Sequence, residues 1–243
     1  EALFPLGEWD ECLKVAEDLA AEDAKRGGSQ VGTFAKMFAA QVRFFRGETT
    51  EPMAMLEEAL ASAREIEDPQ ALMPCLAILI GCTDVSGAAA RAKTLANDFH
   101  ELAPRHPVFL AGSFSAVAQA MRHLEMATEL GALIKVAKPI GPGPTADVDF
   151  ARAAVAEAGG NLAEAFELLS SAIVANDEMS NRFVGTLARI EAARVAGLLD
   201  NATEQIRLLD EGESLAQFMS AGRFLDQIAA MRADGKKAAA GGS

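Results

Sequence analysis

The sequence predicts an all-α protein: an elongated α-α superhelix of about six helical hairpins with a C-terminal capping helix. Half of its 243 residues are hydrophobic, but only 6% are aromatic and none is Tyr. Ala, the strongest helix former, is very frequent, and the continuous β-branched runs typical of buried strands are missing. A short motif also recurs at intervals of about 40 residues, a length typical of two-helix repeats.

The repeated motif begins with Gly, followed by a bulky residue two positions later, a small residue five later, and apolar residues at nine and twelve. Gly ends a helix cheaply because it adopts the left-handed conformation that the reversal needs. The small residue is expected to lie where the two helices cross, so Ala165 and Ala202 are expected to be fully buried. Neighbouring hairpins must then stack to bury their remaining apolar surface. The six copies begin at Gly7, Gly47, Gly87, Arg122, Gly160 and Gly197.

Two copies of the motif resemble a known family. Gly-Glu-Trp-Asp-Glu-Cys-Leu from Gly7 and Gly-Asn-Leu-Ala-Glu-Ala-Phe from Gly160 are similar to the turn and second helix of tetratricopeptide repeats. The units here are longer than the family's usual repeat, and Pro52 replaces a small residue. Units of this kind resemble the C-terminal arrays of bacterial signal-transduction ATPases that activate transcription, and of multidomain nucleotide cyclases. The resemblance implies an interaction or ligand-sensing module within a larger signalling or regulatory protein.

The predicted domain is one array over residues 1–235. Its one long break, Lys138 to Thr145, holds three prolines and is expected to exclude helix. It divides the array into 1–137 and 146–235, either as a hinge or as a stiff loop. Ser29 and Asp68 are expected to cap helices. An apolar stripe of Phe224, Ile228 and Met231 predicts the capping helix, and residues 236–243 are expected to form a disordered tail.

Charge and cysteine content narrow the possible partners and compartments. The net charge of −13 disfavours binding to nucleic acid or to anionic membranes, which require clustered Lys and Arg. No apolar run reaches the length of a transmembrane helix. Cys12, Cys75 and Cys82 are too few for a disulfide framework, so we expect buried, reduced thiols and a cytoplasmic location. The first residue, Glu1, is not Met, and we expect the chain to be a piece of a longer polypeptide.

Nothing in the sequence predicts catalysis. His100, His106 and His123 do not form a pair at metal-ligand spacing, and Gly141-Pro-Gly-Pro-Thr lacks the Lys and the backbone donors of a phosphate loop. We therefore expect no catalytic residue, no metal and no cofactor.

The concave face, lined by the first helix of each hairpin, is the predicted interaction surface. One hypothesis is a scaffold that binds a protein or peptide there, and the other is a small-molecule sensor arm. A deep pocket with convergent polar groups would favour the small molecule, whereas a shallow open groove would favour the polypeptide. The alternative is that the aromatic residues are core and the charged ones merely solvated. The candidate residues are Phe34, Gln41, Phe44, Phe109, Gln119, Glu157, Glu191 and Arg194.

Overall fold

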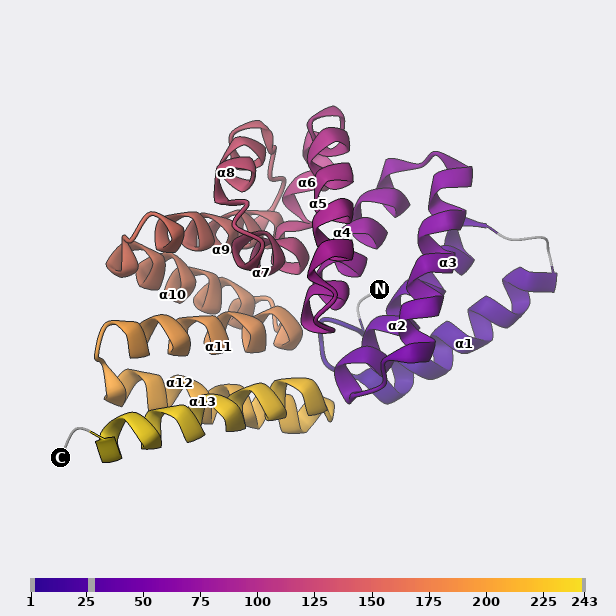
Figure 1. Cartoon of the computed structure of the whole chain (residues 1–243). Helices are drawn as coiled ribbons and strands as arrows, with labels where there is room; N and C mark the ends of the chain where they lie inside the picture. Colours follow the sequence, from indigo (N-terminus) through magenta and orange to yellow (C-terminus); the bar gives the residue numbers. More distant parts are fainter. Residues whose placement is uncertain (1–2, 26–28, 242–243) are drawn as a thin grey trace.

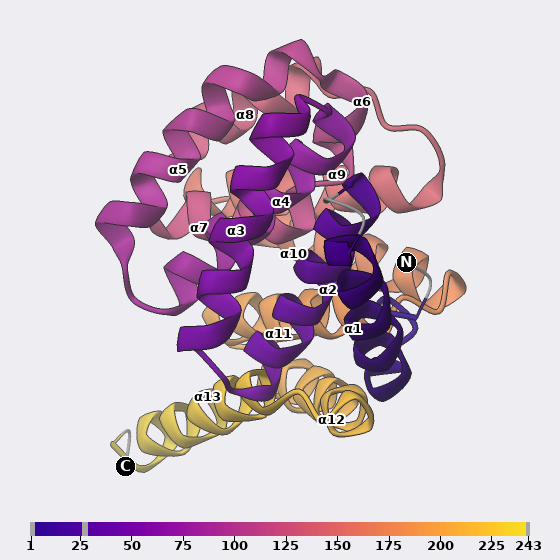
Figure 2. The same cartoon turned by 90° about the vertical axis from the view of Figure 1, so that its right-hand side faces the viewer.

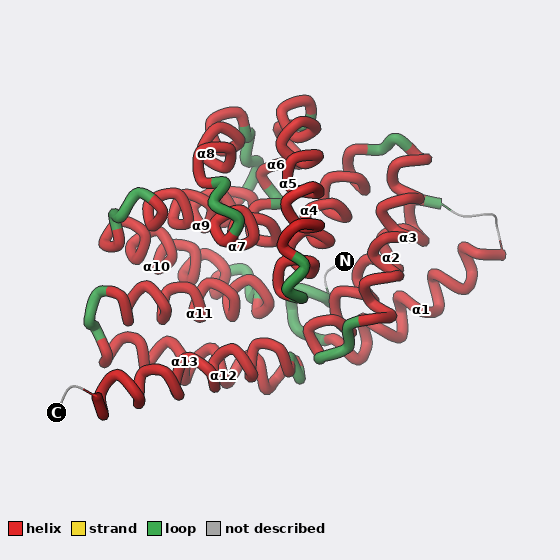
Figure 3. The backbone as a smooth tube through the Cα atoms, in the orientation of Figure 1, coloured by secondary structure: helices red, strands yellow, loops and turns green. Residues whose placement is uncertain are grey.

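The computed structural model describes residues 3–25 and 29–241. The chain is 84% helical, and no strand occurs in the described ranges, which confirms the all-α prediction. Consecutive helices pack against one another and are joined by short loops (Figure 1, Figure 3). The helices are α1 (Trp9–Lys25), α2 (Gln30–Arg46), α3 (Thr50–Ile66), α4 (Pro69–Val85), α5 (Ala89–Leu102), α6 (Pro107–Ala111), α7 (Phe114–His123), α8 (Ala127–Val136), α9 (Pro142–Ala158), α10 (Leu162–Glu178), α11 (Arg182–Leu198), α12 (Ala202–Met219) and α13 (Gly222–Gly241), with a 3₁₀ turn at Ala103–Arg105.

Four of the predicted motif glycines lie in turns that lead into a helix and adopt positive φ angles. Gly7, Gly47, Gly87 and Gly160 have φ of 78°, 118°, 79° and 78°, and they precede α1, α3, α5 and α10 respectively. A side chain would be strained at these positions. The turn role assigned to Gly in these copies is therefore confirmed.

The fourth and sixth copies of the motif were predicted three residues too early. Arg122 and Gly197 lie inside α7 and α11, and the left-handed turn residues are Glu125 (φ 60°) and Asp200 (φ 56°). A polar residue can take this conformation at a helix end at modest cost, so a search for Gly misses it.

The register shift explains the different burial of two alanines. Ala165 is fully buried on α10, which packs against α9, and this prediction is confirmed. Ala202 is exposed because it is the first residue of α12, so the prediction that it is buried was wrong.

The predicted caps are present, but the Pro-rich break is shorter than expected. The Ser29 and Asp68 side chains accept hydrogen bonds from the backbone N–H groups of residues 31 and 70. Helix α9 begins at Pro142, so Pro142 and Pro144 lie in its first turn. First-turn N–H groups have no partner within the helix, and proline is tolerated there. Helix α9 also packs against α7 and α8.

The last helix covers the array as the apolar stripe predicted. Phe224 and Ile228 are 2% and 1% exposed, and Met231 packs against the same core. The backbone of α13 continues to Gly241, so residues 236–241 of the predicted tail extend the helix, consistent with the high helix propensity of Lys and Ala. Residues 242–243 lie outside the described ranges.

The helices pack in sequence as the predicted superhelix requires, and the array curves until its two ends meet, so it is less elongated than expected. Helix α13 packs against α2 as well as against α12 (Figure 2). The accessible surface is 11245 Å², close to the ~10,400 Å² expected for a compact monomer of this mass. The two ends of the array therefore cover each other.

An aromatic cluster and two arginines join these ends. Phe183 of α11 lies 4.8 Å from Phe4 and 4.9 Å from Phe45, measured between ring centroids. Arg223 of α13 donates from Nε to the Phe44 carbonyl (2.6 Å) at the C-terminal end of α2. The backbone N–H of Arg182 donates to the Pro5 carbonyl at 2.7 Å. Aromatic packing and satisfied helix-end carbonyls thus hold the closed arrangement.

Candidate functional site

Closure of the array leaves two adjoining pockets at its centre. The polar pocket, of about 280 Å³, is lined by α2, α4, α7, α11 and α13. The aromatic pocket, of about 600 Å³, is lined by the segment before α1 and by α2, α4, α6, α7, α9 and α11. Most of these elements are first helices of hairpins, so their inward faces converge here. Five residues line both pockets and form the shared wall: Gln41, Ile78, Ser115, Ala116 and Phe183.

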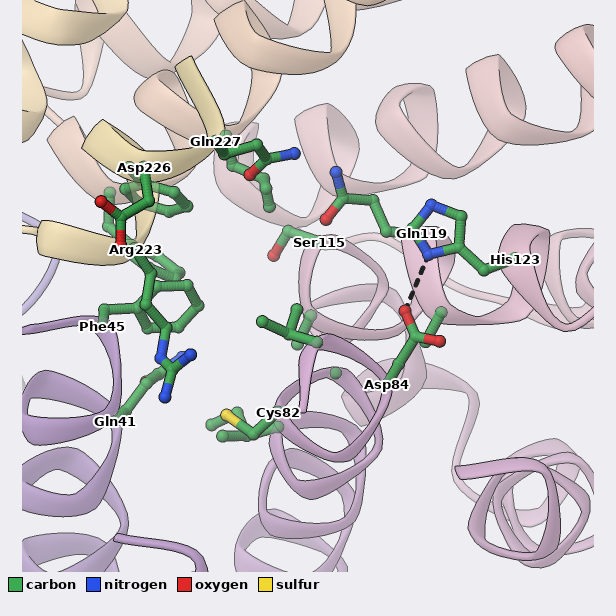
Figure 4. A pocket seen from close by; sticks show the side chains of 18 residues that line it. Gln41, Phe45, Cys82, Asp84, Ser115, Gln119, His123, Arg223, Asp226 and Gln227 are labelled. Atoms are coloured by element: carbon green, nitrogen blue, oxygen red, sulfur yellow. Dashed lines mark hydrogen bonds and ion pairs between the residues drawn. The ribbon is translucent and has the colours of Figure 1, made fainter. Parts of the chain in front are cut away.

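Polar side chains from several helices face the polar pocket (Figure 4). His123 Nδ1 of α7 lies 2.8 Å from the Asp84 carboxylate of α4. Gln119 donates a hydrogen bond to Glu191. The polar lining residues are Gln41, Asp84, Ser115, Gln119, His123, Arg223, Asp226 and Gln227.

The cysteine in this pocket is not a reactive nucleophile. Burial raises the pKa of the Cys82 thiol to about 12, although the charge of Arg223 lowers it slightly. The thiol therefore stays protonated at neutral pH, and the protonated form is a poor nucleophile. Cys12, Cys75 and Cys82 are all buried and free, as predicted.

The aromatic pocket has walls of phenylalanine and, among the described residues, one ionisable group. Its aromatic lining consists of Phe4, Phe34, Phe38, Phe109 and Phe183, and its polar lining of Gln41, Gln70, Ser113, Ser115, Asp147 and Asn181. Val108 and Phe109 are 41% and 37% exposed, so the pocket has an accessible apolar rim.

Asp147 is the unusual residue of the aromatic pocket. Its side chain is only 9% exposed, and Phe150, one turn later on α9, is buried in the core. Burial raises the pKa of the Asp147 carboxyl to about 7, with a hydrogen bond from Ser115 acting in the opposite direction. The carboxyl therefore changes charge near neutral pH.

Helix α4 adds a further acceptor to the same pocket. Pro74 lies inside α4 and has no N–H to donate to the Gln70 carbonyl one turn earlier. Both residues line the aromatic pocket. The wall thus contains a backbone carbonyl without its usual helical partner.

A network of ion pairs lies beside the polar pocket and involves α7, α9 and α11. The Arg122 guanidinium lies 3.3 Å from Glu157 and 3.1 Å from Glu191. Arg194 contacts the same two carboxylates, at 2.7 Å from Glu157 Oε1 and 2.8 Å from Glu191 Oε2. Burial alone would raise the pKa of Glu157, but the hydrogen bond from Arg194 and the charges of Arg194, Arg122 and His123 lower it overall. Each charge in the network is therefore compensated from within the fold.

The eight candidate residues of the concave face separate into three groups. Phe34, Gln41, Phe109 and Gln119 line the central pockets. Glu157, Glu191 and Arg194 belong to the ion-pair network. Phe44 is fully buried, and the Arg223 guanidinium lies 4.0 Å from its ring centroid. Its ring is core in this structure, as the alternative interpretation held for the aromatic residues.

Sequence reasoning did not select Asp147, Ser115 or Arg223. Asp147 could have been found as an acid on the inward stripe of α9, because it precedes Phe150 by one helical turn. Arg223 contacts the end of α2 only because the two ends of the array meet. No local sequence pattern indicates a contact between residues so far apart in the chain.

The described ranges contain neither a metal-binding cluster nor a membrane-spanning helix. No group of three or more His, Cys, Asp or Glu residues there is placed to hold a metal ion. None of the helices in these ranges is long and apolar enough to cross a membrane.

Comparisons with known proteins place the chain in no family. No family model matches it, and no curated protein is similar to it. Among solved structures it is similar to the crystal structure of BtubC (BKLC) from P. vanneervenii, with 14% identity and a TM-score of 0.49, over 90% of this chain and 92% of that one. This similarity is too low to carry an argument about function. The chain is thus described as an all-α helical-repeat protein.

Proposed function

We propose that this protein is a non-enzymatic binding module whose central pockets hold a small molecule, as in the sensor arm of a larger regulatory protein. The observation that carries the proposal is the aromatic pocket of about 600 Å³. Ligand pockets typically have volumes of ~300–1,000 Å³, mostly apolar walls and a few convergent polar groups. The aromatic pocket combines phenylalanine walls with Asp147, Ser115 and Asn181.

Closure of the array favours a small molecule over a polypeptide. In an open superhelix the inner helices leave a continuous groove in which a peptide can lie. Here α13 packs against α2, and Phe183 contacts both Phe4 and Phe45, so the inner face is divided into two adjoining pockets rather than one continuous groove.

A polypeptide partner is the second candidate function, and one observation favours it. Val108 and Phe109 are exposed beside the aromatic pocket, where they could contact a partner that inserts one apolar side chain. The resemblance to tetratricopeptide arrays of cytoplasmic signalling proteins is compatible with either candidate.

The proposal is tested by filling the aromatic pocket. Gly112 lines it, and a Cβ added there meets no atom within 4 Å, so Gly112→Trp is expected to occupy pocket volume without disturbing the fold. Val174, 57% exposed on α10, offers a matched control in Val174→Trp. A library of small metabolites is screened by ligand-observed NMR against the wild type and both variants.

Hits that bind the wild type and Val174→Trp but lose at least tenfold in affinity with Gly112→Trp would support the proposal. Hits that bind Gly112→Trp as tightly as the wild type would place the site elsewhere. If no small molecule binds but a peptide library yields ligands that are sensitive to Gly112→Trp, the polypeptide function replaces the one proposed.

A further inference from the structure

Charge balance in the aromatic pocket indicates what kind of ligand it accepts. Among the residues that the structure describes, Asp147 is the only Asp, Glu, Lys, Arg or His in the lining. The surrounding helices α2, α4, α6, α7 and α11 contribute no charged side chain, and α8 and α10, which pack on other faces of α9, contribute no lining residue. The ionised carboxylate therefore has no cation from the described part of the chain beside it in the pocket, and a buried charge without a partner is costly.

The ionisable groups of the adjoining polar pocket do not supply that cation. Asp84 and His123 pair with each other, and Arg223 donates to the carbonyls of Phe44 and Glu48. Like Asp226, these side chains line the polar pocket and are absent from the lining around Asp147. Among the described residues, then, no side chain supplies a positive charge to the Asp147 carboxylate.

The walls of the pocket suit a cation with an apolar body. Phenylalanine ring faces attract positive charge, and this attraction increases where water is excluded. Phe34, Phe38 and Phe109 line the same cavity as Asp147, and Ser115 is positioned to hydrogen-bond to its carboxyl.

We propose that the aromatic pocket binds a small apolar amine whose ammonium group pairs with the Asp147 carboxylate while its apolar part lies against the phenylalanines. This inference rests on the proposed small-molecule function and specifies the ligand's chemistry. A neutral or anionic molecule of the same shape leaves the carboxylate unpaired and binds more weakly.

The experiment compares three probes with the same apolar body: 4-phenylbutylamine, 4-phenylbutanol and 4-phenylbutyrate. Their affinities for the full chain are measured by calorimetry between pH 5.5 and 8.5. At pH 8 the amine is expected to bind at least tenfold more tightly than the alcohol, and the carboxylate more weakly than either. Below pH 7 the affinity for the amine should fall by up to tenfold per pH unit as the carboxyl takes up its proton.

Asp147→Asn removes the charge and is expected to abolish the preference for the amine while the alcohol binds as before. Asp149→Asn is the matched control, because Asp149 lies on the same helix but pairs with Arg152 (3.1 Å) and is not in the lining. Helicity and thermal midpoint are recorded for each variant, so that unfolding is distinguished from lost recognition.

Three outcomes would overturn the inference. The first is equal binding of amine and alcohol at pH 8, and the second is an equal effect of the two Asn variants. The third is alcohol affinity that falls above pH 7, which would show that the protonated carboxyl donates a hydrogen bond to a neutral ligand. If none of the probes binds, the amine inference fails, whereas the proposed function is decided separately by the library screen with Gly112→Trp.

Discussion

The aromatic pocket and the ion-pair network both use acidic residues on the inner helices, but in opposite ways. In the network, Glu157 and Glu191 each contact Arg122 and Arg194. In the aromatic pocket, Asp147 has a hydrogen bond from Ser115 but no oppositely charged partner among the described lining residues. Helix α9 carries both kinds of acid, since Asp147 and Glu157 lie three turns apart on it.

This difference shows which buried charges serve the fold and which are available to a ligand. A carboxylate that two arginines satisfy is part of the framework that keeps α7, α9 and α11 together. A carboxyl buried without a charged partner weakens the fold when it ionises, and it can recover that free energy only by binding a cation. If the proposed amine site is correct, ion pairing separates the structural acids of the network from the ligand-binding acid Asp147.

The largest expected effect is the pH dependence of stability caused by Asp147. Its pKa is about 7 in the folded chain against an ordinary value of 3.8, so the folded state binds this proton more tightly than the unfolded state. The free energy of unfolding therefore falls as pH rises from ~4 to ~7 and levels off above. Asp147→Asn should be more stable than the wild type at pH 8, by on the order of 4 kcal/mol, and this advantage should vanish near pH 4.

Urea unfolding of the wild type and Asp147→Asn across this pH range measures the difference. Asp149→Asn, which changes the net charge equally, should show no such pH-dependent gain. Parallel stability curves for the wild type and Asp147→Asn would mean that water or a neighbouring group already compensates the Asp147 charge.

Removing an acid from the ion-pair network should lower the free energy of unfolding, whereas Asp147→Asn raises it. Glu191 is 4% exposed and accepts from Gln119, Arg122 and Arg194. Glu191→Ala leaves two partly buried guanidinium groups with Glu157 alone, and it should destabilise the chain by up to ~3 kcal/mol. Equilibrium urea unfolding at pH 7 checks this. A loss below ~1 kcal/mol would show that the network is hydrated and contributes little, and the contrast with Asp147 would then disappear.

Sequence reasoning identifies the all-α class and several turns because those features are local. Gly7 and Gly160 indicate turns in the sequence because few other residues adopt their φ angles without strain. Glu125 and Asp200 give no such signal, and the motif register was wrong there by three residues. Of the residues predicted on the inner face, Phe34, Gln41, Phe109 and Gln119 line pockets, and their role in binding stays a prediction.

What the sequence could not show is how the array closes. The contact of Arg223 with the end of α2 joins residues that are far apart in the chain, and no periodicity encodes it. The same closure turns an open concave face into bounded pockets and buries Phe44. The lack of a charged partner beside Asp147 also depends on this packing, because it is set by which helices surround the residue.

A smaller effect tests whether the two regions depend on the packing of α9. Ala165 of α10 is fully buried, and α10 packs against α9. Ala165→Leu overpacks this site and should destabilise the chain by ~1–3 kcal/mol, whereas Ala202→Leu, at an exposed helix start, should change stability by less than ~0.5 kcal/mol. Thermal midpoints of both variants measure the difference. Equal midpoints would contradict the packing register described for α10 and α12.

The smallest expected effect compares the stability contributed by an exposed ion pair with that contributed by the ion-pair network. Arg207 contacts Glu204 and Glu211 on the surface of α12, with its own side chain 51% exposed. Water and salt screen such pairs, and fixing long side chains costs entropy, so Arg207→Ala should lower the free energy of unfolding by less than ~1 kcal/mol. Added salt should reduce this loss further. The Glu191 side chain is largely shielded from solvent, so the loss of stability in Glu191→Ala should change little between low and high salt. Urea unfolding of both variants at two salt concentrations makes the comparison. A loss in Arg207→Ala equal to that in Glu191→Ala would mean that burial does not distinguish the two sets of ion pairs, and the role assigned to the network in the fold would fail with it.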